Sequence, residues 1–457
     1  MTHDAGSRRL LAAATVLAAV AQFALFGYVL VRTAIASPIS DMFAYIARYL
    51  RYRAGEITLP DYLWQSHYEH RLVWVRLLTW ADVELFHVTG LPFMVAATAA
   101  VLGTALLLWD QLRRAAPQLA APTHLALLVP MVVLSAANAT DCSVAINVTY
   151  PFTVFFAVVA IVLFTGAGKA GPGADLRRGA ALLAGIGASF GTAGGLLVWP
   201  VLFWIGCCER LGAAQLLLLL AFGTAYSIVY MHGLVFLGVP GALQIGAENY
   251  VGVPHLLKLA EYFTTFLGLP IARDPALAML GRLCGGVLFL AGIAVLGAIT
   301  FTGRLDTRLD RIAGGMILFA MGSAFLAALG RGDIAADIEI PIRYTMFATL
   351  LQAGLLCVAL PRLARGGDDP RRSLRVSAGG LALALALLTL QVFIARAAVP
   401  IATAIAHDAD CYAQGATVGP VNPTVTRFPD LAARVLATLR DKELLAPRRA
   451  DCPPSPR

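Results

Sequence analysis

Long runs of apolar residues, separated by short polar stretches, recur along almost the whole chain. A run of about 20 apolar residues is long enough to cross the hydrocarbon core of a membrane as an α-helix. We place eleven such spans, near residues 10–35, 90–112, 121–138, 149–167, 179–193, 194–209, 212–237, 279–302, 312–330, 344–363 and 376–397. The pattern therefore predicts an all-α polytopic membrane protein with about eleven transmembrane helices.

Charged residues are scarce and unevenly placed. Hydrophobic residues fill 59% of the 457 positions and charged residues 14%, whereas soluble domains carry about a quarter charged residues. Basic residues cluster between the apolar runs, at Arg8-Arg9, Arg113-Arg114, Lys169 with Arg177-Arg178, Arg304–Arg311 and Arg362–Arg375. This is the positive-inside pattern, so the net charge of +8 does not indicate a nucleic-acid partner. It predicts a cytoplasmic N-terminus and, after eleven spans, a C-terminus on the outer side.

Two segments are harder to place. Glycines at 191–195 split one long apolar stretch. Residues 72–86 are short and charged, and a crossing there would put Arg113-Arg114 outside, so we interpret them as an interfacial amphipathic or re-entrant helix. The first span has the basic start of a signal peptide, but about 25 apolar residues with no soluble domain after them favour a retained helix.

The long polar loops all fall on the predicted outer side. They are residues 37–89, 138–148, 238–278, 331–343 and the tail from about 398. This divides the chain into a transmembrane domain, residues 1–397, and an exported tail, residues 398–457. Loop 238–278 is long enough to cover a site as a lid. Loop 37–89 follows the first span and predicts two amphipathic helices, about 42–52 and 60–68, whose aromatic residues suit the headgroup level of a bilayer.

The tail holds two cysteines, Cys411 and Cys452, which we expect to form a disulfide because an oxidising compartment favours it. Closing a loop of about 40 residues contributes roughly 3–4 kcal/mol. Apolar residues at helical spacing follow Pro429, at Leu431, Val435, Leu436 and Leu439. The tail is thus expected to be a small ordered cap; the alternative is a disordered tail with free thiols.

Asp41 is the first acidic residue of the outer loop and has two interpretations. A Ser40-Asp41 pair before an amphipathic run is a common helix N-cap. The carboxylate could instead face a cavity at the membrane surface and take part in chemistry. Further along, Glu69-His70-Arg71 puts an acid, an imidazole and a guanidinium at the edge of an apolar segment, where they cost desolvation free energy unless paired or functional.

At this point a family resemblance can be stated. One long span, an outward loop with an early Asp and two amphipathic helices ending in a His-Arg element, and then many spans resemble the GT-C superfamily of membrane glycosyltransferases. The resemblance covers residues 1–397. Two segments, EHRLVWVRLLTWADVELF (69–86) and IPIRYTMFATLLQAGLL (340–356), are similar to Glu-His-Arg and Arg-Tyr segments of bacterial GT-C-like membrane proteins.

The resemblance implies an enzyme that takes a sugar from a polyprenyl-phosphate donor and gives it to an extracytoplasmic acceptor. Asp41 would be the general base or a metal ligand. The chain lacks a second acid beside Asp41 and the Trp-Trp-Asp-Tyr signature of oligosaccharyltransferases, so a divalent metal as cofactor and a protein acceptor both stay open. High use of Ala, Leu, Arg and Gly is typical of a GC-rich bacterium, which implies the inner (plasma) membrane.

A lipid-phosphate leaving group needs fixed cations, because negative charge develops on the phosphate as the bond breaks. Arg343-Tyr344 stands at the entrance of the tenth span, where a guanidinium would grip a phosphate with two hydrogen bonds. The alternative is an anchor that snorkels to the interface. By the same logic Arg48, His70, Arg71 and Arg331 are further candidate cations, and Glu69, beside two of them, is a candidate for substrate binding.

Two other function classes remain on the sequence alone. A transporter or lipid flippase would place ionisable residues deep in several spans and carry paired broken helices. Here the ionisable residues gather at the outer ends and only one glycine-rich break is present. Another membrane transferase, such as an acyltransferase or a polysaccharide polymerase or ligase, would also combine outer Arg and His residues with many spans.

Overall fold

The described part of the chain is helical. The structure is a computed structural model, and it describes residues 2–115, 123–166, 173–234, 253–272, 277–331, 342–364, 369–415, 425–426, 428–446 and 452. Eight of its helices are long and apolar enough to cross a membrane: α1 (Thr2–Arg32), α5 (Leu91–Ala115), α8 (Thr149–Phe164, which a 3-10 turn from Ala145 extends), α11 (Ala213–Met231), α14 (Ala278–Gly297), α15 (Arg308–Arg331), α16 (Thr345–Ala364) and α17 (Pro370–Ala413). The polytopic helical character predicted from the sequence is confirmed.

Three further expected spans are shorter or bent. The segment His124–Val133, which contains α6 (Leu128–Val133), meets α7 (Ala136–Cys142) at 45°, and the two would together make a ninth span. The two expected spans on either side of the glycine-rich break correspond to α9 (Ala174–Ser189) and to the 3-10 helix η4 (Ala193–Leu197) followed by α10 (Val198–Cys208). Each is only 16 residues long. The total of eleven spans therefore stays a prediction.

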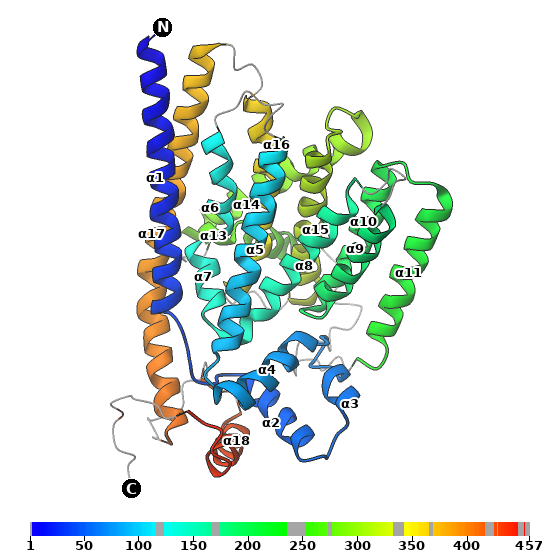
Figure 1. The fold of residues 1–457 in the computed structure, drawn as a ribbon, viewed down its shortest axis with the longest axis vertical. Helices are drawn as coiled ribbons and strands as arrows, with labels where there is room; N and C mark the ends of the chain where they lie inside the picture. Colours follow the sequence, from blue (N-terminus) through cyan, green and yellow to red (C-terminus); the bar gives the residue numbers. More distant parts are fainter. Residues whose placement is uncertain are drawn as a thin grey trace.

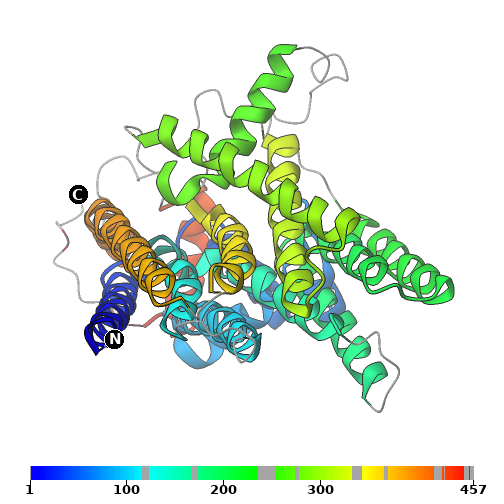
Figure 2. The ribbon, with the colours of Figure 1, turned by 90° about the horizontal axis from the view of Figure 1, so that it is seen from above.

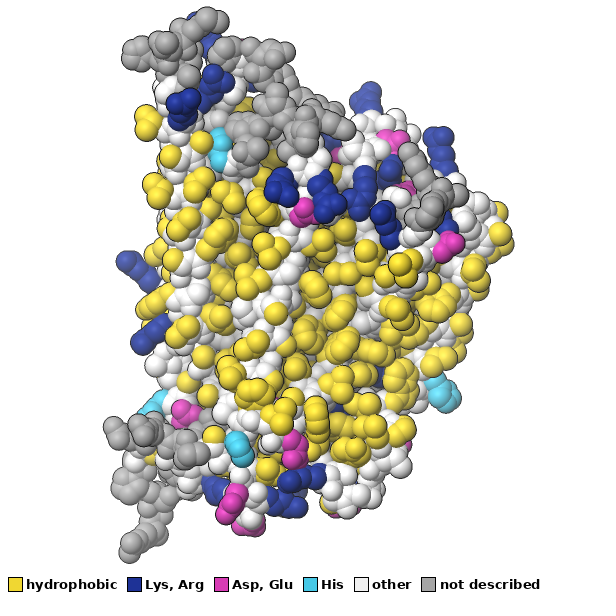
Figure 3. All heavy atoms as spheres, in the orientation of Figure 1, with side chains coloured by type: hydrophobic (Ala, Val, Ile, Leu, Met, Phe, Trp, Pro, Cys, Tyr) yellow, Lys and Arg dark blue, Asp and Glu magenta, His cyan; other side chains and the backbone are white. Residues whose placement is uncertain are grey.

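The polar and apolar surfaces of the bundle separate along its long axis. A broad band of hydrophobic side chains covers the middle of the face shown in Figure 3, which suits contact with a bilayer. Lys and Arg side chains gather mainly above that band, on the side where α1 begins. The opposite end carries the helices of the first loop, α2 (Met42–Arg53), α3 (Leu59–Trp64) and α4 (Val73–Phe86), together with α18 (Pro429–Asp441) (Figure 1). At 14 residues, α4 is short of a span and lies across this end.

The last long helix extends beyond the expected end of the transmembrane domain. We expected the final span to finish near residue 397, but α17 runs to Ala413 and continues through Pro400. It lies beside α1 (Figures 1 and 2), and Ala398 and Ala409 are buried. The sequence 398–413 is rich in alanine, the strongest helix former, so the helix persists after the apolar run has ended.

The first loop and the tail share one apolar core. Phe43, Ile46 and Tyr49 of α2 are buried in the same cluster as Val435, Leu436 and Leu439 of α18, and Ala413 at the end of α17 belongs to it as well. The helical stripe expected after Pro429 is therefore the buried face of α18. The tail stabilises α2, the helix that begins beside Asp41.

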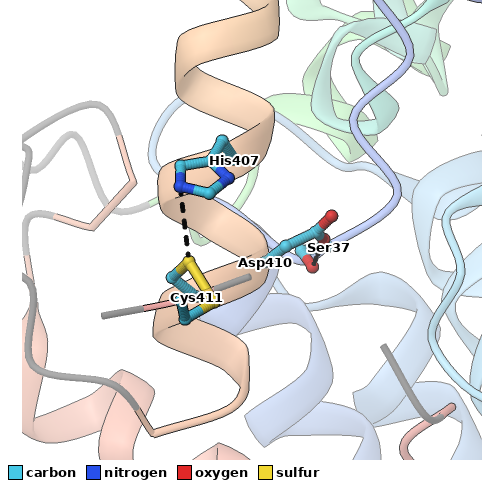
Figure 4. The surroundings of a disulfide bond; sticks show 5 residues. Ser37, His407, Asp410 and Cys411 are labelled. Atoms are coloured by element: carbon cyan, nitrogen blue, oxygen red, sulfur yellow. Dashed lines mark hydrogen bonds between the residues drawn. A yellow bond between two sulfur atoms is a disulfide. The ribbon is translucent and has the colours of Figure 1, made fainter. Parts of the chain in front are cut away.

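Covalent and polar links reinforce this contact. Cys411, in the last turn of α17, forms a disulfide with Cys452. Close to it, the Ser37 hydroxyl donates a hydrogen bond to the Asp410 carboxylate (Figure 4). The backbone N–H of Ser40 donates to the carbonyl of Val425 at 2.8 Å. The start of the first loop is thus held against the end of α17.

Candidate functional site

Asp41 directly precedes α2 but does not cap it. Its backbone carbonyl accepts a hydrogen bond from the N–H of Tyr45 at 3.1 Å, whereas its carboxylate makes no capping hydrogen bond. Instead, Oδ2 lies 3.6 Å from Nε2 of His67, and 31% of the Asp41 side chain is exposed. The carboxylate is thus directed at an imidazole and remains reachable from solvent.

His67 is held in a fixed orientation. Its ring lies edge-on between the rings of Tyr45 and Tyr68, with centroids 4.8 and 4.6 Å away. His67 and His70 exchange two backbone hydrogen bonds, of 2.8 and 3.0 Å, which close a tight turn. Tyr68 adopts the left-handed conformation in that turn, φ 52°, which costs an L-residue about 1–2 kcal/mol. Strain of this kind persists only where the surroundings hold it in place.

His70 ties this turn to the glycine-rich break. Its Nδ1 accepts the backbone N–H of Ala193 at 3.1 Å, so its proton is assigned to Nε2, which lies 3.4 Å from Oε1 of Glu69. Ala193 opens η4 directly after the break. A Cβ at Gly195 would lie 2.5 Å from the backbone nitrogen of Ser189, so glycine is required for this close approach.

Arg71 serves a structural purpose. The side chain is buried, and its guanidinium donates to the backbone carbonyls of Trp64, Tyr230 (2.7 Å) and His232. Burial lowers its pKa, and the Trp64 ring lies 4.6 Å from its Cζ. These contacts join the first loop to the C-terminal end of α11 and leave little for a phosphate. Glu69, two residues away, lies against His70.

Arg343 belongs to an aromatic cluster near Asp41. It lies in the short 3-10 helix η8 (Ile342–Tyr344), and its Cζ is 6.0 Å from the ring of Tyr150 and 5.9 Å from that of Tyr344. Its pKa is raised by Tyr150 first, against the effect of burial, and then by Tyr344 and by the Asp41 carboxylate. The folded chain therefore brings Asp41 and Arg343 into one electrostatic neighbourhood.

Tyr45 connects the members of this cluster. Burial raises the pKa of its phenol, and Asp41 and Tyr150 raise it further, whereas Arg76 and Arg343 act in the opposite direction. The phenol therefore stays protonated and can donate a hydrogen bond. Sequence reasoning treated Tyr45 only as a headgroup-level aromatic residue. Its spacing of four from Asp41, which puts both on one side of a helix, was the available signal.

The remaining expected site residues are peripheral or lie outside the described residues. Arg48 donates from Nη2 to the backbone carbonyl of Asp61 at 2.7 Å, and burial followed by Arg51 lowers its pKa. Residues 235–252, which include the first part of the expected lid, and residues 332–341 are not described. The described part of the lid is mainly α12 (Val253–Leu267), where Phe266 stacks on Tyr344 with ring centroids 5.1 Å apart.

A divalent metal ion at Asp41 would need several ligand side chains close together. Within the described ranges, no three side chains of the kinds His, Cys, Asp and Glu come together as metal ligands. Asp41 has one imidazole as its neighbour, His67. The described donors therefore do not form a metal site at Asp41.

Comparisons with protein-family models, with curated proteins and with solved structures found no match for this chain.

Proposed function

We propose that this protein is a membrane glycosyltransferase, which moves a sugar from a polyprenyl-phosphate donor to a hydroxyl of an extracytoplasmic acceptor. The observation that carries the proposal is the position of Asp41 and Arg343. They lie far apart in the sequence, yet in the fold the Asp41 carboxylate raises the pKa of Arg343, and both groups act on the pKa of Tyr45. The reaction needs these two groups, a base for the acceptor and a cation for the leaving phosphate.

Each group has one task in the proposed reaction. Asp41 accepts the proton of the acceptor hydroxyl, whose oxygen then forms a bond to the anomeric carbon of the donor sugar. The bond from that carbon to the phosphate oxygen breaks, and its electron pair leaves with the polyprenyl phosphate. Arg343 stabilises the charge on this phosphate, and burial among aromatic rings strengthens the attraction because the local dielectric constant is low.

His67 and Tyr45 support the two ends of the site. His67 faces the Asp41 carboxylate at 3.6 Å and can receive the proton that Asp41 has taken up. Tyr45, protonated between Asp41 and Arg343, offers its hydroxyl to a substrate oxygen. The rigid turn around His67 keeps the pair aligned, which is what general-base catalysis requires of an active-site carboxylate.

The proposed orientation follows from charge. The end of the bundle opposite the site carries the basic loops, and cytoplasmic loops are enriched in Lys and Arg. We therefore place the site on the periplasmic side of a bacterial plasma membrane, with the N-terminus in the cytoplasm and the C-terminus in the periplasm.

A transfer assay tests the proposal. Purified protein in liposomes would receive a panel of polyprenyl-phosphate donors with radiolabelled sugars and an envelope extract as acceptor. The proposal expects labelled sugar in the acceptor fraction and free polyprenyl phosphate in equal amount. Movement of the intact lipid between leaflets without transfer would identify a flippase instead. Transfer of an acyl chain from the extract would identify another class of transferase.

A further inference from the structure

Arg76 is a buried cation whose hydrogen-bonding capacity is largely unused. It lies on α4 with 2% of its surface exposed. Its Nη2 donates to the backbone carbonyl of Gln65 at 3.1 Å, and its Cζ lies 5.7 Å from the ring of Tyr62. Nε and Nη1 are buried and have no hydrogen-bond partner, and within the described residues no acidic side chain lies within 4.0 Å of the guanidinium.

Arg71 makes more hydrogen bonds than Arg76 does. Both guanidinium groups are buried at the same end of the bundle, but Arg71 donates to three backbone carbonyls and Arg76 to one. Leaving a charged donor buried without a partner costs several kcal/mol, and such groups are retained mainly where they have a function. Packing alone does not explain Arg76.

A second arginine makes the local charge still more unfavourable without an anion. Burial, and after it Arg48 from the neighbouring α2, lower the pKa of Arg76 to about 10. Nε of Arg48 is also buried without a hydrogen-bond partner. The two guanidinium groups thus repel one another, and an anion bound at Arg76 would relieve both the repulsion and the unused donors.

We propose that Arg76, assisted by Arg48, forms a second anion site that binds a phosphate or carboxylate group of the acceptor. The inference rests on the proposed glycosyl transfer and adds a property of its acceptor, a negative charge. Arg76 and Arg343 both act to lower the pKa of the Tyr45 phenol, so this site and the proposed donor-phosphate site have Tyr45 as a common neighbour. A diphosphate donor is the other source of the same chemistry, with its second phosphate on Arg76.

The short helix α3 covers the site and would have to move for an anion to enter. Tyr62 is its buried residue, and the phenol donates to the backbone carbonyl of Arg76 at 2.6 Å. Gln65, which ends α3, supplies the carbonyl on Nη2. With only six residues and one buried side chain, α3 can be displaced at low cost compared with the long helices.

Phosphate titration of the purified, full-length protein tests the site without any need for turnover. Thermal unfolding and calorimetric binding would be measured with inorganic phosphate and with pyrophosphate, for wild type, Arg76→Gln, Arg343→Gln and Arg71→Gln. We expect Arg76→Gln to unfold at or above the wild-type temperature in the absence of phosphate and to bind phosphate about tenfold more weakly at one site. Arg71→Gln should unfold earlier because it strands three carbonyls.

The variants also separate the two sources of the anion. An acceptor site predicts that Arg343→Gln keeps the phosphate binding that Arg76→Gln loses, whereas a diphosphate donor predicts that each variant weakens pyrophosphate binding. An Arg76→Gln protein that is destabilised like Arg71→Gln, or that binds phosphate as wild type does, overturns the proposal. Should Arg76→Gln not fold, Arg48→Gln takes its place, and unchanged phosphate affinity there overturns it equally. Because no sugar transfer is measured, a negative result leaves the glycosyltransferase proposal to its own assay.

Discussion

The carboxylate of Asp41 and the imidazole of His67 face each other, with Oδ2 and Nε2 3.6 Å apart. Asp41 precedes α2, and His67 follows α3, so the whole length of two helices separates them along the chain. The tight turn at Tyr68 and the rings of Tyr45 and Tyr68 hold the imidazole in place. The pair is therefore a product of the folded loop rather than of adjacent sequence.

The pairing predicts a coupled effect on turnover. His67→Gln should lower kcat by roughly ten- to hundredfold with little change in the KM for the donor, because the imidazole acts through Asp41 and not on the sugar. In a double-mutant cycle with Asp41→Asn, the second substitution should add little to the first. Additive losses would show that His67 acts independently of Asp41.

Arg343 should respond to a change that preserves its charge. Arg343→Lys is expected to raise the KM for the polyprenyl-phosphate donor about tenfold, because an ammonium cannot make the two parallel hydrogen bonds of a guanidinium. Arg71→Lys, the matched substitution, should mainly reduce the yield and melting temperature of folded protein, since it loses bonds to backbone carbonyls. Donor titrations on both purified variants distinguish the two roles. An unchanged donor KM in Arg343→Lys would assign that residue to interfacial anchoring.

Loss of the disulfide should loosen the first loop as well as the tail. Cys411→Ser opens a loop closed over 41 residues, which corresponds to roughly 3–4 kcal/mol of local stability. Because α18 packs on α2, limited proteolysis should then cut both the tail and the region 37–71 faster than in wild type. Cys207→Ser, at an exposed free thiol, is the control. Faster cleavage confined to the tail would mean that α2 does not depend on α18.

The orientation of the chain can be measured directly. Engineered cysteines in the loops 169–178, 304–311 and 365–375 should react only with reagents that reach the cytoplasm. A tag at the C-terminus should be accessible from the outer side. A cytoplasmic C-terminus would contradict both the count of eleven spans and the placement of the disulfide in an oxidising compartment.

The sequence predicted the helices and part of the site. Features that depend on local sequence patterns could be predicted, whereas features that depend on contacts between distant residues could not. Apolar runs and the stripe after Pro429 are local patterns, and they gave eight clear spans and the buried face of α18. The hydrogen bonds of Arg71 could not be predicted, because two of its three acceptors are backbone carbonyls at Tyr230 and His232, far along the chain. The expected final span ended near residue 397, but α17 continues to Ala413, because an alanine-rich segment stays helical after the apolar run has ended.

His67 shows the same limit within the site. It was one polar residue among many in the loop, and its position opposite Asp41 depends on a turn and on packing between separate helices. The neighbourhood of Asp41 and Arg343 likewise exists only once η8 approaches the first loop. Long-range contacts of this kind have no single-sequence signature.

The central claim is that the Asp41 carboxylate removes the proton from the acceptor, and turnover of Asp41→Asn measures this most directly. Sugar transfer from a radiolabelled polyprenyl-phosphate donor would be followed for wild type, Asp41→Asn and the control Glu56→Gln, an exposed acid of the same loop. We predict that Asp41→Asn loses turnover by about two orders of magnitude or more, while its melting temperature and the activity of Glu56→Gln stay near wild type. Near-normal transfer by a folded Asp41→Asn protein would contradict the account.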